Sequence, residues 1–249
     1  MNTLRFARIA SGLLALGAAL DLSAQVVFNA NGTYTQSFDS LPFDTATQLT
    51  WTDNSTLAGW YAAPTPLANA YVSRNTNTGS PSGSDLYVYA DPLNAADRAF
   101  GSFTSTSASS SIFYGVQLMN NTGHVLDSVS ISFALENYRG GASAGDLLLA
   151  SFGLNNSDLL SGSWTPLASL NYTDISNTLS LSALTWNDGD SLWIRWEDTV
   201  FSAGTNPKNA AFGLDNFSVT AIPEPSTYAL ILGVATLGLV GFRRWRAQR

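Results

Sequence analysis

The chain has 249 residues, of which 45% are apolar, 12% are aromatic and only 12% are charged. Eleven basic residues stand against 18 acidic ones, a net charge of −7, which argues against nucleic acid as a partner because phosphate binding needs clustered positive charge. The absence of cysteine excludes disulfides and thiol chemistry, and the single histidine, His124, excludes a histidine-cluster metal site.

The first 24 residues have the three parts of a secretory signal. Arg5 and Arg8 form a positive start, residues 9–20 are an apolar run, and Ala24 supplies a small residue at the expected cut. The run is short for a transmembrane helix. We therefore expect residues 1–24 to be a helical signal peptide that exports the chain. A buried N-terminal helix is the alternative.

From residue 25 onward, short apolar or alternating runs recur between glycine, asparagine, aspartate and serine residues. Residues 125–135 alternate apolar side chains with serines, the period of a half-buried strand. Residues 120–123 and 187–190 are rich in the residue types that favour tight turns. This pattern predicts a mainly β fold, a single jelly-roll-like antiparallel β-sandwich over residues 25–221.

Short motifs of the middle region share their order with a family of extracellular bacterial β-sandwich domains. They lie at residues 51–57, 59–61, 97–101, 120–123, 136–141, 192–196 and 213–218. The region resembles that family from about residue 38 to residue 220, with Asn137-Tyr138 where the family commonly has Gln-Trp. The resemblance implies an extracellular β-sandwich, found in PEP-CTERM proteins and beside secreted nuclease-like domains, and no defined activity.

The C-terminal region has three consecutive parts. A motif of Pro223, Glu224 and Pro225 is followed by residues 228–242, which carry no charge. At ~1.5 Å per residue this run makes about 22 Å of helix, and flanking aromatic and arginine side chains can reach both membrane interfaces. We expect a single transmembrane helix, with its C-terminus held in the cytoplasm by the positive-inside rule. The basic residues that close the chain are Arg243, Arg244, Arg246 and Arg249.

The order and spacing of these parts resemble the PEP-CTERM sorting signal of Gram-negative bacteria, over residues 222–249. The resemblance implies recognition and processing near Pro223, Glu224 and Pro225 by an exosortase, a membrane cysteine transpeptidase or protease. It also implies transient anchoring in the inner membrane, transfer to the cell envelope or the outside, and association with exopolysaccharide. A plain C-terminal membrane anchor is the alternative.

Two acidic residues are candidate calcium ligands. Asp215 lies at the start of the last predicted strand, where jelly-roll carbohydrate-binding modules often use an acid for a structural calcium, and Asp39 lies in the N-terminal strand region. Calcium needs six to eight oxygen ligands, so calcium is the one cofactor that we consider. The alternative for Asp215 is an aspartate that stabilises a turn.

Four residues on the polar sides of two predicted strands form a candidate ligand face: Glu136, Tyr138, Trp193 and Arg195. If both polar sides lie in one sheet, the aromatic rings would stack on sugar rings and the charged groups would bind hydroxyls. The alternative is an ion pair of Glu136 with Arg195 or Arg139, with Trp193 packed beneath it.

No pair of carboxylates lies in a motif that sets a catalytic separation, so we expect a protein that is not an enzyme. The sequence predicts an exported envelope or extracellular-matrix component associated with exopolysaccharide. A carbohydrate-binding module is the alternative, and a secreted hydrolase is less favoured.

Overall fold

The structure is a computed structural model. It describes residues 26–29, 32–44, 48–63, 67–72, 81, 83–91, 93–106, 110–139, 142–143, 145–171, 173, 176–202, 208–222, 233–238, 242–244 and 246. The predicted signal peptide, the motif of Pro223, Glu224 and Pro225, and Arg249 lie outside the described residues.

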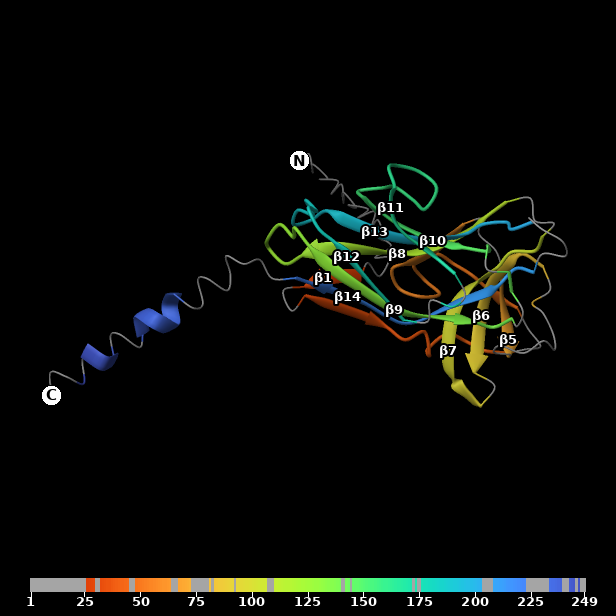
Figure 1. The fold of residues 1–249 in the computed structure, drawn as a ribbon, viewed down its shortest axis with the longest axis horizontal. Coiled ribbons are helices and arrows are strands. Elements are labelled where there is room, and N and C mark those ends of the chain that lie inside the picture. The colour runs from red at the N-terminus through yellow and green to blue at the C-terminus, as the bar shows by residue number, and fades with distance from the viewer. Residues whose placement is uncertain are drawn as a thin grey trace, which may run out of the picture.

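The described part of the chain consists mainly of short strands that form two sheets (Figure 1). Their bounds are β1 Val26–Asn29, β2 Thr33–Gln36, β3 Leu49–Thr50, β4 Trp60–Ala63, β5 Leu67–Val72, β6 Asp85–Asp91, β7 Asn94–Phe103, β8 Ile112–Asn121, β9 Val129–Asn137, β10 Leu148–Leu154, β11 Thr165–Leu170, β12 Ser176–Leu181, β13 Ser191–Asp198 and β14 Ala211–Ala221.

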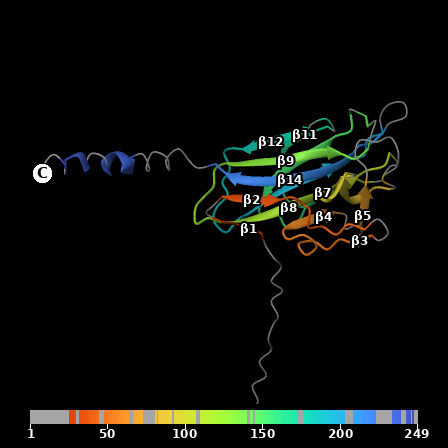
Figure 2. The same ribbon diagram turned by 90° about the horizontal axis from the view of Figure 1, so that it is seen from below.

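The six-stranded sheet has the order β1-β8-β13-β10-β11, with β4 also paired to β8. The eight-stranded sheet has the order β12-β9-β14-β7-β6-β5-β3, with β2 also paired to β14. Figure 2 shows β9, β14 and β2 side by side. The predicted β-sandwich is confirmed, but it is not wholly antiparallel, because β1 runs parallel to β8 and β5 runs parallel to β6.

The hydrophobic core lies between the two sheets. Strand β9 alternates buried and half-buried residues along its whole length, as the period of residues 125–135 predicts. Strand β13 contributes Leu192, Ile194 and Trp196 to the same core. Trp196 stacks on Trp60 of β4 with 6.0 Å between ring centroids. Burying such large rings is the main source of sandwich stability, at roughly 25 cal/mol per Å² of apolar surface.

The C-terminal region is helical where it is described, at residues 233–238, 242–244 and 246 (Figure 1). Its arginines Arg243, Arg244 and Arg246 are exposed. None of the helices in the described part of the chain is long and apolar enough to cross a membrane. Much of the predicted helix at residues 228–242 falls outside the described residues, so the membrane span stays a prediction.

Candidate functional site

The four residues of the predicted ligand face are divided between the two sheets. Glu136 on β9, with Tyr138 just after it, belongs to the eight-stranded sheet, whereas Trp193 and Arg195 on β13 belong to the six-stranded sheet. Each pair lies on the outer side of its own sheet, with the core between them. The prediction of one shared face is wrong, and so is the alternative ion pair between Glu136 and Arg195. Alternation along a strand shows which side a residue takes, but not which sheet the strand joins.

On the outer face of the eight-stranded sheet, Tyr87, Tyr89 and Tyr138 form a tyrosine stack. The rings of Tyr89 and Tyr138 are 4.3 Å apart at 10°, and those of Tyr87 and Tyr89 are 5.6 Å apart at 18°. A side chain at Gly213 would lie 2.8 Å from the Tyr138 ring, so the absence of a Cβ there makes room for the stack.

The tyrosine stack is closed to solvent, with none of its rings more than 2% exposed. Its hydroxyls are used internally: Tyr138 donates to the Glu136 carboxylate, and Tyr89 donates to the carbonyl of Ser102 at 2.8 Å. Burial raises the pKa of Tyr89 well above its usual range. A closed stack of this kind stabilises the sheet but offers no ring face to a ligand.

On the outer face of the six-stranded sheet, Arg195 is the centre of a different aromatic group. Its guanidinium carbon lies 4.0 Å from the ring centroid of Trp164 and 5.1 Å from that of Phe113. Its Nε donates to Ser151 Oγ at 3.1 Å, and one terminal nitrogen donates to the carbonyl of Leu159. Partial burial lowers the pKa of Arg195, and Glu197 opposes that shift. These hydrogen bonds hold the guanidinium within cation–π distance of both rings.

The loop between β10 and β11 places Trp164 over this arginine. Asn155 and Gly162 adopt positive φ values of 53° and 86°, which let the loop turn back over the sheet. Inside the loop, the Asp158 carboxylate accepts hydrogen bonds from backbone nitrogens. The hydrogen bond from the Leu160 nitrogen is the main reason that the pKa of Asp158 is lowered. Trp164 Nε1 donates to the carbonyl of Ser161 at 3.0 Å. The indole is therefore oriented, and it stays half-exposed.

Trp193 and Tyr61 extend this aromatic group along the sheet. Their ring centroids are 4.7 Å apart, and the Tyr61 hydroxyl donates to Gln117 Oε1 at 3.1 Å. Trp193 is buried, and its Nε1 has no hydrogen-bond partner in the described part of the chain, whereas Tyr61 and Gln117 are partly exposed. We call this surface the β13 face.

The β13 face consists of Tyr61, Phe113, Trp164, Trp193 and Arg195, from four elements that are neighbours in the sheet or its loop. Sequence reasoning found Trp193 and Arg195 but missed the three half-exposed aromatics. For Phe113 the signal was available, because it has the opposite parity to the core residues Ile112 and Tyr114 on the same strand. Trp164 could not be found, because it reaches Arg195 from a loop.

The two predicted calcium ligands are engaged in other contacts. The Asp39 carboxylate accepts the backbone N–H of Arg98 at 3.0 Å. The Asp215 carboxylate accepts the backbone and side-chain N–H groups of Asn216, both at 2.6 Å, beside a bulge where Asn216 has a φ of 49°. These are the contacts expected of turn-stabilising aspartates. In the described residues, no three histidine, cysteine or acidic side chains gather as a metal site. The calcium pair stays a prediction.

A second polar group lies inside the sandwich, where β7 and β13 end. Asp198 accepts hydrogen bonds from Ser102 Oγ at 2.7 Å and from Thr104 Oγ1 at 2.9 Å. Asp146 and Asn209 belong to the same group, and all five side chains are fully buried. We call this group the buried carboxylate cluster.

Both carboxylates of the cluster have raised pKa values. Burial raises the pKa of Asp198 to about 8, and the neighbouring Asp146 carboxylate adds to the rise while the hydroxyls of Ser102 and Thr104 oppose it. Burial raises the pKa of Asp146 to about 6, opposed by a backbone hydrogen bond and by Arg139. Ionising Asp198 and Asp146 in the folded state therefore costs more free energy than ionising an aspartate in water.

No family model matches the chain, and no curated protein matches it. Among solved structures, it is similar to the CBM22-2 xylan-binding domain of Paenibacillus barcinonensis Xyn10C, with 14% identity, a TM-score of 0.42, and coverage of 76% of this chain and 99% of that one. A chitosan-binding module from Paenibacillus sp. IK-5 has 15% identity, a TM-score of 0.29, and coverage of 70% and 96%.

An arabinose-bound α-L-arabinofuranosidase has 16% identity and a TM-score of 0.41, with coverage of 80% of this chain and 29% of the enzyme. The chain thus spans less than a third of that enzyme. At these identities and TM-scores the likenesses carry no argument about what the chain binds.

Proposed function

We propose that this protein is an exported carbohydrate-binding module of the bacterial envelope, and that the β13 face contacts the polysaccharide. The observation that supports the proposal is the partial exposure of Phe113 and Trp164 around the Arg195 guanidinium, with Tyr61 on the same outer side of the sheet. Partial exposure of a single aromatic ring is ordinary, but a contiguous group of such rings on the outer side of a sheet is the kind of patch that marks a binding surface.

The chemistry of the β13 face suits a sugar polymer. The C–H faces of pyranose rings are apolar and pack on aromatic rings, while hydroxyls at the ring edge need hydrogen-bond donors and acceptors. The half-exposed rings supply the first requirement. Arg195, Glu197 and Gln117 lie on the same side of β13 and β8 and supply the second. Binding a polysaccharide by ring packing and hydrogen bonds does not need a catalytic pair of carboxylates.

The expected structural role in an exopolysaccharide matrix is the competing proposal. A purely structural component would show no saturable binding, whereas a binding module would show affinity that depends on the β13 face. The two roles share the partner, exopolysaccharide, and differ in whether one defined surface holds it.

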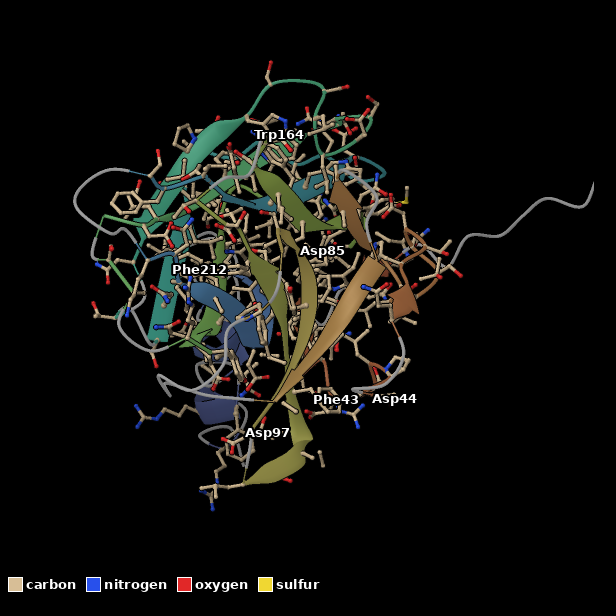
Figure 3. All side chains as sticks on the ribbon, turned by 90° about the vertical axis from the view of Figure 1, so that its right-hand side faces the viewer. Phe43, Asp44, Asp85, Asp97, Trp164 and Phe212 are labelled. Atoms are coloured by element: carbon tan, nitrogen blue, oxygen red, sulfur yellow. The ribbon has the colours of Figure 1, made fainter. Side chains whose placement is uncertain are left out.

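The test is affinity electrophoresis of the full chain in gels that contain xylan, β-1,4-galactan, chitosan or the exopolysaccharide of the producing cells. Trp164→Ala should restore free mobility in the gel that retards wild type. Phe43→Ala is the matched control, because Phe43 is also a half-exposed ring with an arginine over it, Arg98 at 5.8 Å. Figure 3 shows Trp164 and Phe43 far apart on the molecule. Retardation by none of the polymers would leave the structural role as the better account.

Sorting by an exosortase is a second part of the proposal, supported by the sequence of residues 222–249 alone. Between two prolines, Glu224 lies in a stretch that cannot continue a helix, which leaves its backbone open to a protease. Glu224→Ala should leave export and folding intact but block processing, so full-length protein should build up in the inner membrane. An immunoblot of fractionated cells decides it. Wild-type processing of the variant would favour a plain anchor.

A further inference from the structure

We propose that the buried carboxylate cluster binds a calcium ion between the two sheets, with Asp146 and Asp198 as its charged ligands and Asn209 as a neutral one. The proposal is independent of the polysaccharide function, and it concerns residues other than the predicted pair Asp39 and Asp215.

The cluster is assembled from four separate parts of the chain. Asp198 ends β13 in the six-stranded sheet, and Thr104 directly follows β7 in the eight-stranded sheet. The Thr104 hydroxyl lies 2.9 Å from Asp198 Oδ1 and accepts Asn209 Nδ2 at 3.3 Å. Asp146, just before β10, accepts the N–H of Ala210, the residue after Asn209. The contacts join both sheets at one end of the sandwich.

Two oxygen atoms of the cluster, Asp146 Oδ1 and Asn209 Oδ1, are buried and have no hydrogen-bond partner among the described residues. Both residues are fully buried. The Asn209 amide nitrogen donates to the Thr104 hydroxyl that contacts Asp198, which leaves the amide oxygen of the same side chain unpartnered. Leaving a buried acceptor without a hydrogen bond costs free energy, so we expect a bound ion or molecule to contact these atoms.

The donor set matches a hard cation. Both unpartnered atoms of the cluster are oxygens, and calcium takes carboxylate, amide and backbone carbonyl oxygens as ligands. A backbone carbonyl is at hand, since Thr199 O lies 3.0 Å from the Thr104 hydroxyl. Arg139 is a nearby cation that lowers the pKa of Asp146. One of its guanidinium nitrogens donates to the carbonyl of Asn209 at 2.9 Å, and the guanidinium lies over the ring of Phe103. One arginine leaves two buried carboxylates incompletely compensated.

The consequence of an ion here is a bridge between the sheets. Ser102 and Thr104 come from the eight-stranded sheet and Asp198 comes from the six-stranded sheet. A cation would take the place of the proton that Asp198 holds because of its raised pKa, and it would attract the carboxylates of Asp198 and Asp146 to a shared charge. Calcium should therefore stabilise the folded chain by mass action.

The test is thermal unfolding of the full chain at about pH 7.5, stripped with a chelator and then given about 10 mM CaCl₂, above the ~0.1–1 mM dissociation constants of extracellular calcium modules. The melting temperature of wild type should rise by roughly 3–6 °C. Asp198→Asn and Asp146→Asn, which keep the side-chain shape, should lose the rise. Asp127→Asn, at an exposed carboxylate, and Asp215→Asn should retain it.

A second measurement guards against variants that fail to fold. Wild type purified without chelator should contain about one calcium per chain by inductively coupled plasma mass spectrometry, since one ligand set can hold one ion. The proposal is overturned by wild type that holds no calcium and shows no thermal response. It is also overturned if Asp215→Asn abolishes the rise while the two cluster variants keep it, because the ion would then sit at the predicted pair.

Discussion

The two outer faces of the sandwich both carry aromatic side chains, yet they differ in what those side chains can reach. On the eight-stranded sheet, Tyr87, Tyr89 and Tyr138 stack on one another and are closed to solvent. On the six-stranded sheet, Trp164 and Phe113 pack around Arg195 and stay half-exposed. Exposure, and not aromatic content, therefore separates a structural layer from a candidate binding face.

The difference arises from which groups contact the rings and whether those groups cover the ring faces. The tyrosines use their own hydroxyls on Glu136 and on backbone carbonyls, so the stack is complete without a partner. The rings of the β13 face are ordered by a guanidinium and a loop, which fix their orientation without covering them. A face that is ordered and uncovered loses little conformational entropy when a ligand binds.

The largest expected effect is on the tyrosine stack. Tyr138→Ala should lower the free energy of unfolding by about 3–5 kcal/mol, because it removes a fully buried ring and leaves a cavity against Tyr89. Tyr138→Phe should cost only about 1–2 kcal/mol, since it removes the hydroxyl and leaves Glu136 without that donor. Urea denaturation measures both. A loss below about 1 kcal/mol for Tyr138→Ala would show that the stack is not structural.

The next prediction is that the free energy of unfolding depends on pH because of the buried carboxylate cluster, and not because of either outer face. Asp198 and Asp146 have folded pKa values of about 8 and about 6, above the value of 3.8 for an ordinary aspartate. The folded state therefore holds protons that the unfolded state has released. In chelator, the free energy of unfolding should fall by several kcal/mol as the pH rises from about 4 to about 8, at ~1.4 kcal/mol per pH unit for each group that is protonated only in the folded state.

Urea denaturation in chelator at several pH values checks this expectation. Asp198→Asn has no charge to bury, so its stability should depend much less on pH over the same range. Neither Tyr138→Ala nor Trp164→Ala should alter the slope. A wild-type stability that rises with pH would contradict the raised pKa values.

The third prediction tests the β13 face directly. Trp164→Ala should weaken polysaccharide binding by about tenfold or more, equivalent to about 1.4 kcal/mol. Its cost in folding stability should stay below about 1 kcal/mol, because the indole is half-exposed. Affinity electrophoresis gives the first quantity and urea denaturation the second. If the variant loses several kcal/mol of folding stability, Trp164 has a structural role like that of the tyrosine stack.

The smallest effect is expected at the hairpin between β6 and β7. Leu93 is 95% exposed at its tip, and Figure 1 shows the hairpin extending from the body of the sandwich. Leu93→Ser should change the free energy of unfolding by less than about 0.5 kcal/mol and should leave polysaccharide binding unchanged. Weaker binding by this variant would move the binding surface from the β13 face to the hairpin.

Much of the local structure could be predicted because it depends on neighbours in the sequence. The alternation in β9 holds in the structure, and Trp193 and Arg195 lie on the opposite side of β13 from its core residues Leu192, Ile194 and Trp196. Alternation works because successive side chains of a strand point to opposite faces. The two parallel strand pairs, β1 with β8 and β5 with β6, were missed because the sequence of a short strand does not show the direction in which it pairs.

The candidate sites could be predicted only in part. Trp193 and Arg195 were correctly placed on one outer side of their strand, but Glu136 and Tyr138 lie on the far side of the molecule. The buried carboxylate cluster left no signal, because Asp146 and Asp198 are isolated aspartates in the sequence. Their partnership depends on burial and on strand order, which pair residues far apart along the chain.

By itself, the sequence determined that this chain forms short alternating strands with a buried and an outer side, between end segments that resemble export and sorting signals. Those properties follow from local periodicity, turn chemistry and composition. Only the tertiary structure decided which strands share a sheet, and therefore that Trp164 covers Arg195, that the tyrosines close on one another, and that two carboxylates meet inside. The reason is physical: strand order sets which outer sides coincide, and burial sets which of those side chains a ligand can reach.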